Sequence, residues 1–469
     1  MHAGETLDQR YIAFRDMTSA VFARFPQLEP LRHTIFRDFV MRPRPLGFQE
    51  TVKHWIRPLW RSNRTGTALE RADILLWVEG GRSIIRDTLL PVFHELRRRG
   101  VRAQLVSGNG PVNLPDRTIC FRYPAGARTP RWARPAWEAL CDAEPQIGRD
   151  SLRRSFLYAC ANLNSFLTEM DRVLGNMRPT AVVAASTQMT GGSALCVSAH
   201  SRGIRTVLLQ HGIVQPFYTP LAAELMLTWG RSSNETLERL GIAPQRLIAL
   251  GSPRHDSMGT SGNGTGKQIL MRELSLKERC ILVFFSNGND PLRNGVAPRE
   301  CARWLNTVAE RFRDDLHVLV RLHPNEDGAL YRDCPRLIMT KDSPAFETLM
   351  EGCDCVSSLC STAMHEALLY GKPVWQLYAD GWPELADNWT NGLAKRVSSE
   401  FELAACVTRL LNTDRRERQQ DHLVQEVFTN HGRAAGAVAD YILSQARPDN
   451  LPFPRSGDRH GRRIERTPA

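Results

Sequence analysis

Short apolar runs that end at glycine or at a polar turn alternate with amphipathic segments along most of this 469-residue chain. The first example is ADILLWVEGG at 72–81, which is followed by SIIRDTLLPVFHELRRRG at 83–100 and by a second apolar run, VRAQLVS, at 101–107. Compact apolar runs between turn residues indicate buried strands, and the segment between them repeats its apolar residues at helical spacing. A strand, a helix and a second strand in this order predict a parallel βαβ unit and an α/β fold.

The pattern occurs in both halves of the chain. AVVAAS at 181–186 and TVLLQHG at 206–212 continue it in the first half, and CILVFFSNGND at 280–290 restarts it in the second. A chain of this length exceeds what one core usually fills, and four glycines lie in the segment 259–266 between the halves. We therefore expect two doubly wound, Rossmann-like domains that face a cleft. The expected parts are a helical basic extension (1–70), a first domain (71–258), a linker (259–266), a second domain (267–446) and a disordered tail (447–469).

The formal charge of +11 predicts an anionic partner or surface. Arginines concentrate between Arg32 and Arg71, where Trp55 and Trp60 stand among them. Basic residues beside tryptophan suit peripheral contact with anionic lipid, and a solvated helix whose aromatic residues pack on the domain behind it is the alternative. No nucleic-acid motif accompanies the charge, so nucleic acid is not expected as a partner.

The sequence predicts a cytoplasmic protein, with the inner face of the cell membrane as the place of any lipid contact. No run reaches the ~18 apolar residues that a membrane span needs, and MHAGETLDQR at the start lacks the apolar core of a signal peptide. The eleven cysteines are odd in number and scattered, which predicts reduced thiols.

The segment from Ile338 to Pro373 is the most suggestive of a ligand. It contains a strand, a turn rich in serine and threonine, and a helix that opens at Ala363. Free backbone N–H groups and the positive end of the helix dipole favour a phosphate at such a turn, together with the hydroxyls. We expect this segment to hold the diphosphate of a nucleotide-activated donor.

Four motifs give the chain a family resemblance, and they appear in this order: QHG at 210–212, LGSPRHD at 250–256, RLHP at 321–324 and SSLCSTAMHEALLYGKPV at 357–374. Together they resemble two-domain glycosyltransferases of the GT-B fold that build bacterial surface polysaccharides of the capsule and lipopolysaccharide type. The related groups are sialyl- and polysialyltransferases with His-Pro and Ser-Thr motifs, and CDP-glycerol glycerophosphotransferases. The likeness covers about residues 72–411.

The resemblance implies a nucleotide-sugar donor in the second domain. His323 matches the His-Pro motif, Ser361 and Thr362 match the Ser-Thr motif, and Glu366 stands where related enzymes place a carboxylate against the ribose or sugar. Chemically, His323 can donate to a departing phosphate and the two hydroxyls can support it. A structural turn histidine is the alternative for His323.

Weaker donor-site candidates lie nearby in the sequence. Arg321 and Asn325 flank the His-Pro turn, and Asn287 follows the first strand of the second domain. Arg254 and His255 close the LGSPRHD loop. Capping of loops and solvation at the surface are equally good explanations for these residues.

An inverting transfer also needs a base on the acceptor side, worth ~10²–10⁴ in rate. His211 matches the His-Gly motif that polyol-phosphate transferases use as base, and Glu79 ends the first strand, where many relatives use an acid. A packing or hinge role beside Gly212 is the alternative for His211. No DxD motif stands at a strand end, so we expect no metal and no cofactor beyond the nucleotide-sugar substrate.

The predicted function is transfer of a sugar from a nucleotide donor to a surface polysaccharide or lipid-linked glycan. Polyol-phosphate transferases usually have an aromatic residue before His-Gly, whereas this chain has Gln210, which favours a sugar transferase. Three alternatives stay open: a CDP-polyol phosphotransferase of the teichoic-acid type, a hydrolysing nucleotide-sugar 2-epimerase, and a non-catalytic binder of nucleotides or polyanions.

Overall fold

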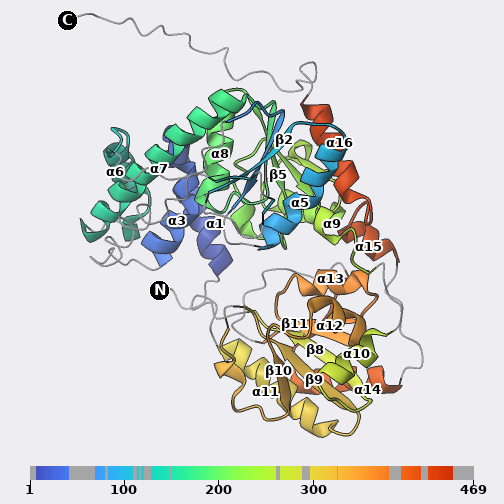
Figure 1. Cartoon of the computed structure of the whole chain (residues 1–469). Coiled ribbons are helices and arrows are strands. Elements are labelled where there is room, and N and C mark those ends of the chain that lie inside the picture. The colour runs from blue at the N-terminus through green and yellow to red at the C-terminus, as the bar shows by residue number, and fades with distance from the viewer. Residues whose placement is uncertain are drawn as a thin grey trace, which may run out of the picture.

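Two parallel sheets organise the protein (Figure 1). The computed structural model describes residues 7–41, 69–79, 83–108, 114–115, 118–120, 128–147, 150–259, 265–287, 296–324, 326–379, 392–412 and 421–446. The first sheet has seven strands in the order β3-β2-β1-β4-β5-β6-β7. Their bounds are β1 Ile74–Val78, β2 Ala103–Ser107, β3 Ile119–Cys120, β4 Ala181–Ala184, β5 Arg205–Leu209, β6 Leu225–Thr228 and β7 Leu247–Ala249.

The second sheet has six strands in the order β10-β9-β8-β11-β12-β13. Their bounds are β8 Cys280–Phe285, β9 Leu316–Arg321, β10 Leu337–Thr340, β11 Cys355–Ser358, β12 Val374–Leu377 and β13 Lys395–Val397. Every strand pairing in both sheets is parallel. The prediction of two doubly wound α/β domains is therefore confirmed.

Burial explains why the apolar runs became central strands. All five side chains of β1 and of β5 are buried, because helices cover both faces of the sheet. The larger helices are α5 Ser83–Arg98, α6 Ala133–Ala143, α7 Asp150–Met177, α8 Thr190–His200, α9 Arg231–Arg239, α10 Gly266–Glu273, α11 Val296–Arg311, α12 Phe346–Gly352, α13 Ala363–Leu369, α14 Glu400–Asn412, α15 Asp421–Val427 and α16 Ala434–Gln445.

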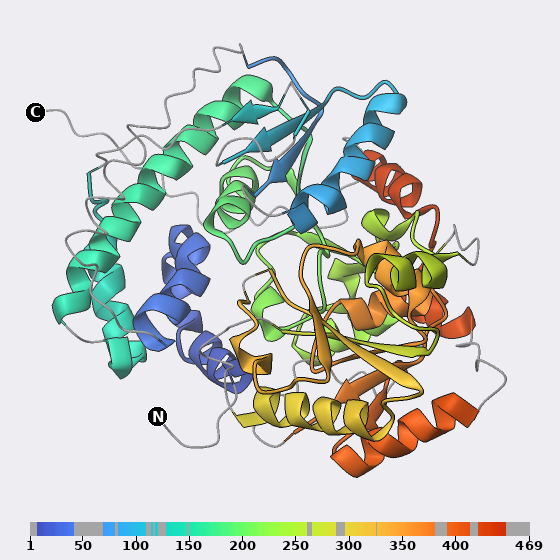
Figure 2. The same cartoon turned by 60° about the horizontal axis from the view of Figure 1, so that its bottom comes forward.

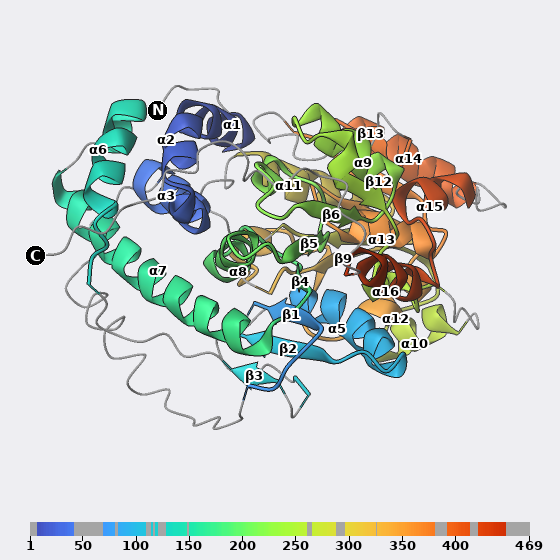
Figure 3. The ribbon, with the colours of Figure 1, turned by 90° about the horizontal axis from the view of Figure 1, so that it is seen from above.

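The N-terminal helices are part of the first domain. Tyr11, Phe14 and Phe36 are buried in the same cluster as side chains of α6, α7 and α8. Figure 3 shows α1, α2 and α3 on the same side of the molecule as α6, α7 and α8. The bounds of the N-terminal helices are α1 Leu7–Met17, α2 Ser19–Arg24, η1 Pro26–Leu31, α3 Arg32–Ile35 and η2 Phe36–Met41. The basic segment with Trp55 and Trp60 lies outside the described residues, as do most of the linker and the tail from 447.

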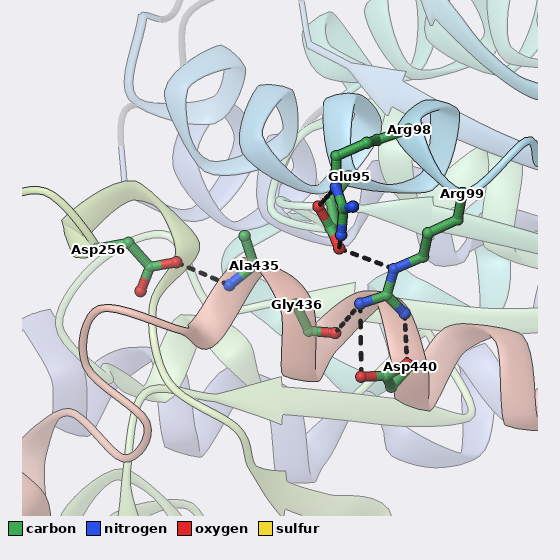
Figure 4. Close-up of polar contacts among 7 residues, drawn as sticks. All are labelled: Glu95, Arg98, Arg99, Asp256, Ala435, Gly436 and Asp440. Atoms are coloured by element: carbon green, nitrogen blue, oxygen red, sulfur yellow. Dashed lines mark hydrogen bonds and ion pairs between the residues drawn. The ribbon is translucent and has the colours of Figure 1, made fainter.

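The C-terminal helices are divided between the two sheets. α14 lies beside α11 on the second domain (Figure 2), whereas α16 packs against α5 of the first. Both carboxylate oxygens of Asp256 accept from backbone N–H groups at the start of α16, at 2.9 Å from Ala434 N and 2.8 Å from Ala435 N. Arg99, the residue that follows α5, pairs with Asp440 of α16 (Figure 4). The range 267–446, expected to form one domain, thus contributes its last helix to the other.

Two further properties follow from the described part of the chain. None of its helices has both the length and the low charge that crossing a membrane would require. Ten of the eleven cysteines are free thiols in the structure.

Candidate functional site

Most of the predicted site residues lie just beyond strand ends. In a parallel sheet the carboxyl ends of the strands share one edge, where ligands of α/β proteins bind. Glu79 follows β1 and His211 follows β5, and β4 lies between these two strands in the sheet. In the second sheet, His323 follows β9 and Ser361 follows β11. The candidates therefore gather at one edge of each sheet.

Glu79 is held as a hydrogen-bond acceptor at the start of α8. It is 5% exposed, and its Oε2 accepts from Trp77 Nε1 at 2.8 Å and from the backbone N of Gly192 at 3.2 Å. Both donors, and the positive end of the helix, favour the charged carboxylate. A side chain at position 191 has no room here, because a Cβ would lie 2.6 Å from the Trp77 ring.

His211 is half-buried in the loop between β5 and β6. Its Nδ1 lies 3.2 Å from the hydroxyl of Tyr218, which ends the short helix η4 (Pro216–Tyr218). Tyr218 is buried in a cluster beneath the loop. No sequence pattern singles out Tyr218, because its contact with His211 depends on how residues 212–217 turn back.

Gln210 links the ends of two strands. Its Oε1 accepts from the backbone N of Trp229 at 2.8 Å, and its backbone oxygen accepts from the Trp229 indole at 2.9 Å. Its Nε2 donates to the carbonyl of Gly212 at 2.9 Å. The glutamine of the QHG motif therefore fixes the course of the His211 loop.

The His-Pro turn is anchored to the end of β8. The backbone N of His323 donates to Ser286 Oγ at 2.7 Å, and Ser286 Oγ in turn hydrogen-bonds to the Glu326 carboxylate. Burial lowers the pKa of the His323 imidazole, and the charge of Glu326 raises it in part. His323 is therefore neutral at pH 7.

Arg321 and Lys341 hold neighbouring backbone at this turn. Arg321 Nη1 donates to the carbonyl of Pro344 at 2.9 Å, and burial lowers the pKa of its guanidinium. Lys341 Nζ donates to the carbonyl of Glu326 at 3.0 Å. Asn325 lies outside the described residues.

The Ser-Thr turn precedes α13 and is shaped by Asn287. Thr362 is the residue immediately before the helix, and Ser361 Oγ accepts from the backbone N of Ala363 at 3.3 Å. The Asn287 side chain donates to the carbonyl of Cys360 and accepts from its backbone N at 3.2 Å. Asn287 thus holds the turn through its amide, and its expected place in a donor site stays a proposal.

Glu366 faces the first domain rather than open space. It is 3% exposed, and its Oε1 pairs with Arg254 and lies 3.0 Å from Nε2 of His255. Burial lowers the pKa of Arg254 to about 10, which leaves it charged. Burial, with the charge of Arg254, lowers the pKa of His255 well below its ordinary range. A neutral His255 donates from Nε2 to the carboxylate and accepts from Ser252 Oγ at Nδ1, at 2.6 Å.

Apolar side chains also join the domains at the strand ends. Ile213, two residues after His211, packs against the core of the second domain. Trp229, which follows β6, is buried with second-domain side chains, and its ring lies edge-on to His255 at a centroid distance of 5.1 Å. The His211 loop and the end of β6 therefore touch the second domain.

Comparison with known proteins supports the fold and goes no further. No protein-family model matches the chain, and the search of curated proteins found no match. A solved UDP-GlcNAc 2-epimerase from Methanocaldococcus jannaschii is similar over 79% of this chain and 99% of its own, with 13% identity and a TM-score of 0.53. A putative UDP-N-acetylglucosamine 2-epimerase from Listeria monocytogenes is similar over 80% and 96%, with 12% identity and a TM-score of 0.55.

A glycosyltransferase from Rickettsia africae is similar over 80% of this chain and 98% of its own, with 10% identity and a TM-score of 0.52. At identities this low, the structural similarity shows a shared fold and nothing more. That fold is the GT-B type expected from the sequence. The closer relation to sialyltransferases or CDP-glycerol transferases is not shown by these neighbours.

Proposed function

We propose that the chain is a nucleotide-sugar enzyme, and that it transfers a sugar with inversion from a nucleotide donor to a surface polysaccharide or lipid-linked acceptor. The observation that carries the proposal is the contact between the two sets of strand ends. Ile213, beside His211, packs on the domain whose strand ends carry His323 and Ser361. That arrangement brings a donor side and an acceptor side together, as a two-substrate reaction needs.

On the donor side, the Ser-Thr turn and the His-Pro turn would stabilise the departing nucleotide. The Ser361 and Thr362 hydroxyls stand at the start of α13, and Asn287 holds their turn in place. A neutral His323 can donate one hydrogen bond to a phosphate oxygen, and Arg321 adds positive charge nearby. Charge that develops on the leaving phosphate would meet fixed donors.

On the acceptor side, His211 and Glu79 are the groups that could take a proton from a hydroxyl. Both lie at the carboxyl edge of the first sheet. Glu79 is buried and accepts two hydrogen bonds, so little water competes for its carboxylate. Glu366 would reach a donor ribose only by sharing its carboxylate with Arg254 and His255.

A hydrolysing 2-epimerase is the second candidate, because several structures of this fold are UDP-GlcNAc 2-epimerases. Such an enzyme releases nucleotide from the donor alone. A transferase releases it fast only when the acceptor is present. One assay of nucleotide release with and without glycan acceptor therefore separates the two reactions.

The first experiment is a thermal-shift screen of the full chain against CMP, CDP, UDP and GDP, since a ligand that binds only the folded state raises its apparent stability. The nucleotide that binds then selects the sugar donors for the release assay. His323→Ala should lower the rate by ~10² or more. His317→Ala, on the same strand but at its other end, is the matched control. Absence of any shift and of any release across these donors would contradict the proposal.

Contact with an anionic membrane through the basic N-terminal segment is a separate proposal. It rests on the arginines and tryptophans between Arg32 and Arg71. Flotation of the full chain with vesicles of phosphatidylserine, and with neutral phosphatidylcholine vesicles as control, tests it. Equal recovery with both vesicle types would contradict it.

A further inference from the structure

Within the part of the chain that the structure describes, the hydroxyl of Tyr218 has one side-chain hydrogen-bond partner. Tyr218 is 2% exposed, and a buried phenol hydroxyl that lacks an acceptor is strongly unfavourable. Among the hydrogen bonds of the described residues, the one side-chain partner of this hydroxyl is Nδ1 of His211, at 3.2 Å. The ring planes lie 44° apart with centroids 5.7 Å apart, so the hydroxyl approaches the ring edge.

The protonation state of the phenol decides the direction of this hydrogen bond. Burial raises the pKa of Tyr218, and backbone N–H groups of His211 and Gly212 directed at the oxygen lower it in part. The phenol therefore keeps its proton at neutral pH. Because Nδ1 of His211 is the one side-chain acceptor of this hydroxyl among the described residues, the phenol donates to Nδ1.

We propose that Tyr218 fixes neutral His211 in the tautomer that carries its proton on Nε2. Which ring nitrogen of a histidine is protonated is set by the hydrogen bond that the other one makes. His211 then presents an N–H donor to an oxygen of bound substrate and has no lone pair for a hydroxyl proton. Tyr218 is a positioning residue, and the base role falls to Glu79. The catalytic meaning rests on the proposed function, whereas the tautomer does not.

The N-terminal helix holds the phenol in this place. Tyr11 of α1 is fully buried, and its hydroxyl donates to the carbonyl of Thr219 at 2.7 Å. Arg15 Nη1 donates to Thr219 Oγ1 at 2.8 Å, and the Tyr11 ring lies 4.5 Å from that of Phe217. The residues on both sides of Tyr218 are thus attached to α1, so the phenol cannot turn away from His211 without breaking these contacts.

Nuclear magnetic resonance of the full chain with 15N-labelled histidine tests the tautomer directly. The His211 signal is identified among the thirteen histidines by its absence from the spectrum of His211→Gln. We expect long-range proton–nitrogen correlations that place the proton on Nε2, and an Nδ1 resonance shifted by an accepted hydrogen bond. In Tyr218→Phe that shift should disappear, whereas Tyr441→Phe on α16 should leave it unchanged. A proton on Nδ1 in the unmodified chain would overturn the proposal.

Turnover supplies the second test. A glutamine side chain keeps an N–H donor but cannot act as a base. His211→Gln should therefore retain kcat within about ten-fold of the unmodified enzyme, while His211→Ala should lose ~10²–10³, the usual effect of removing one fixed donor. Equal losses in both variants would overturn the donor role. If no nucleotide donor is turned over by the unmodified chain, the proposed function fails, and the magnetic resonance result still decides the tautomer.

Discussion

Arg254 and Glu366 form a buried ion pair between the two domains, although 112 positions separate them in the chain. Arg254 belongs to the short helix η6 (Pro253–His255), which packs on α5, and Glu366 belongs to α13 of the second domain. His255 binds the same carboxylate oxygen. Removal of one partner of such a pair destabilises the fold strongly, because the other charge then stays buried without compensation.

Glu366→Gln should destabilise the protein by about 3–5 kcal/mol, because it leaves the Arg254 guanidinium buried without its carboxylate. The free energy of unfolding from urea titration measures this. Glu238→Gln, an exposed position on α9, is the control and should change stability by less than about 0.5 kcal/mol. Equal stability of the two variants would show that the pair contributes nothing.

Asp256→Ala should loosen α16 without unfolding the rest. The carboxylate accepts from two backbone N–H groups at the helix start, and loss of such a cap costs about 0.5–2 kcal/mol. Hydrogen exchange should become faster across α16 and leave α14 unchanged. Uniformly faster exchange in both helices would contradict a local role.

Gly191→Ala should lower stability and turnover together. The new methyl group would lie 2.6 Å from the Trp77 ring and 2.7 Å from Glu79 Oε2, and forcing such a group into a packed site costs about 1–3 kcal/mol. Gly175→Ala in α7 is a matched control, since its Cβ meets only Arg202 Nη1 at 3.8 Å and alanine favours a helix by about 1 kcal/mol. The melting temperature should therefore fall in Gly191→Ala and rise in Gly175→Ala.

Stability should fall as the pH falls from 7.5 to 5.5. Burial lowers the pKa of His365 to about 4, and burial with nearby arginines lowers that of His33 to about 3; His255 is shifted in the same direction. In the unfolded chain these histidines take up protons near their ordinary pKa of 6.5, whereas in the folded chain they stay neutral to lower pH. Below pH 6.5, each of them therefore lowers the free energy of unfolding by up to about 1.4 kcal/mol per pH unit.

Urea titrations at pH 7.5 and 5.5 measure this slope. His365→Gln should reduce this slope by the contribution of one histidine. Thr168→Val on α7, which removes no titratable group, should not change it. A slope that is equal in all three proteins would contradict the assignment to buried histidines.

Ser361→Ala and Thr362→Val should weaken binding of the preferred nucleoside diphosphate, each by about ten-fold or more, because a hydrogen bond to a charged group contributes about 1.5–3 kcal/mol. Isothermal titration calorimetry measures the affinity. Thr168→Val on α7, whose hydroxyl bonds within its own helix, is the control. Unchanged affinity in both turn variants would remove the Ser-Thr turn from the proposed site.

The sequence predicted what depends on local pattern. The apolar runs around Leu76 and Val283 became buried strands, because period and length alone distinguish such runs from exposed segments. The places of Glu79 and His323 at strand ends followed from the same pattern. The GT-B fold was predicted through motifs and is matched by the solved neighbours.

Contacts between distant residues could not be predicted in this way. Glu366 was expected at a donor ribose, and nothing near it in the sequence indicates Arg254 or His255 as its partners. Asn287 was expected to line a ligand, yet its amide holds the turn at Cys360. Tyr218 contacts His211 across a loop, and α1 contacts the residues on both sides of Tyr218, which is a tertiary effect.

The packing of α16 on α5 has a consequence for how the protein is made. Val438, Ala439 and Ile442 of α16 complete the core around β1, yet they are synthesised after all the strands of the second sheet. The first domain, although synthesised first, must therefore wait with part of its apolar surface uncovered until the second domain has been translated. We expect ribosome-bound chains that end before α16 to bind chaperones, and released full-length chains to lose them.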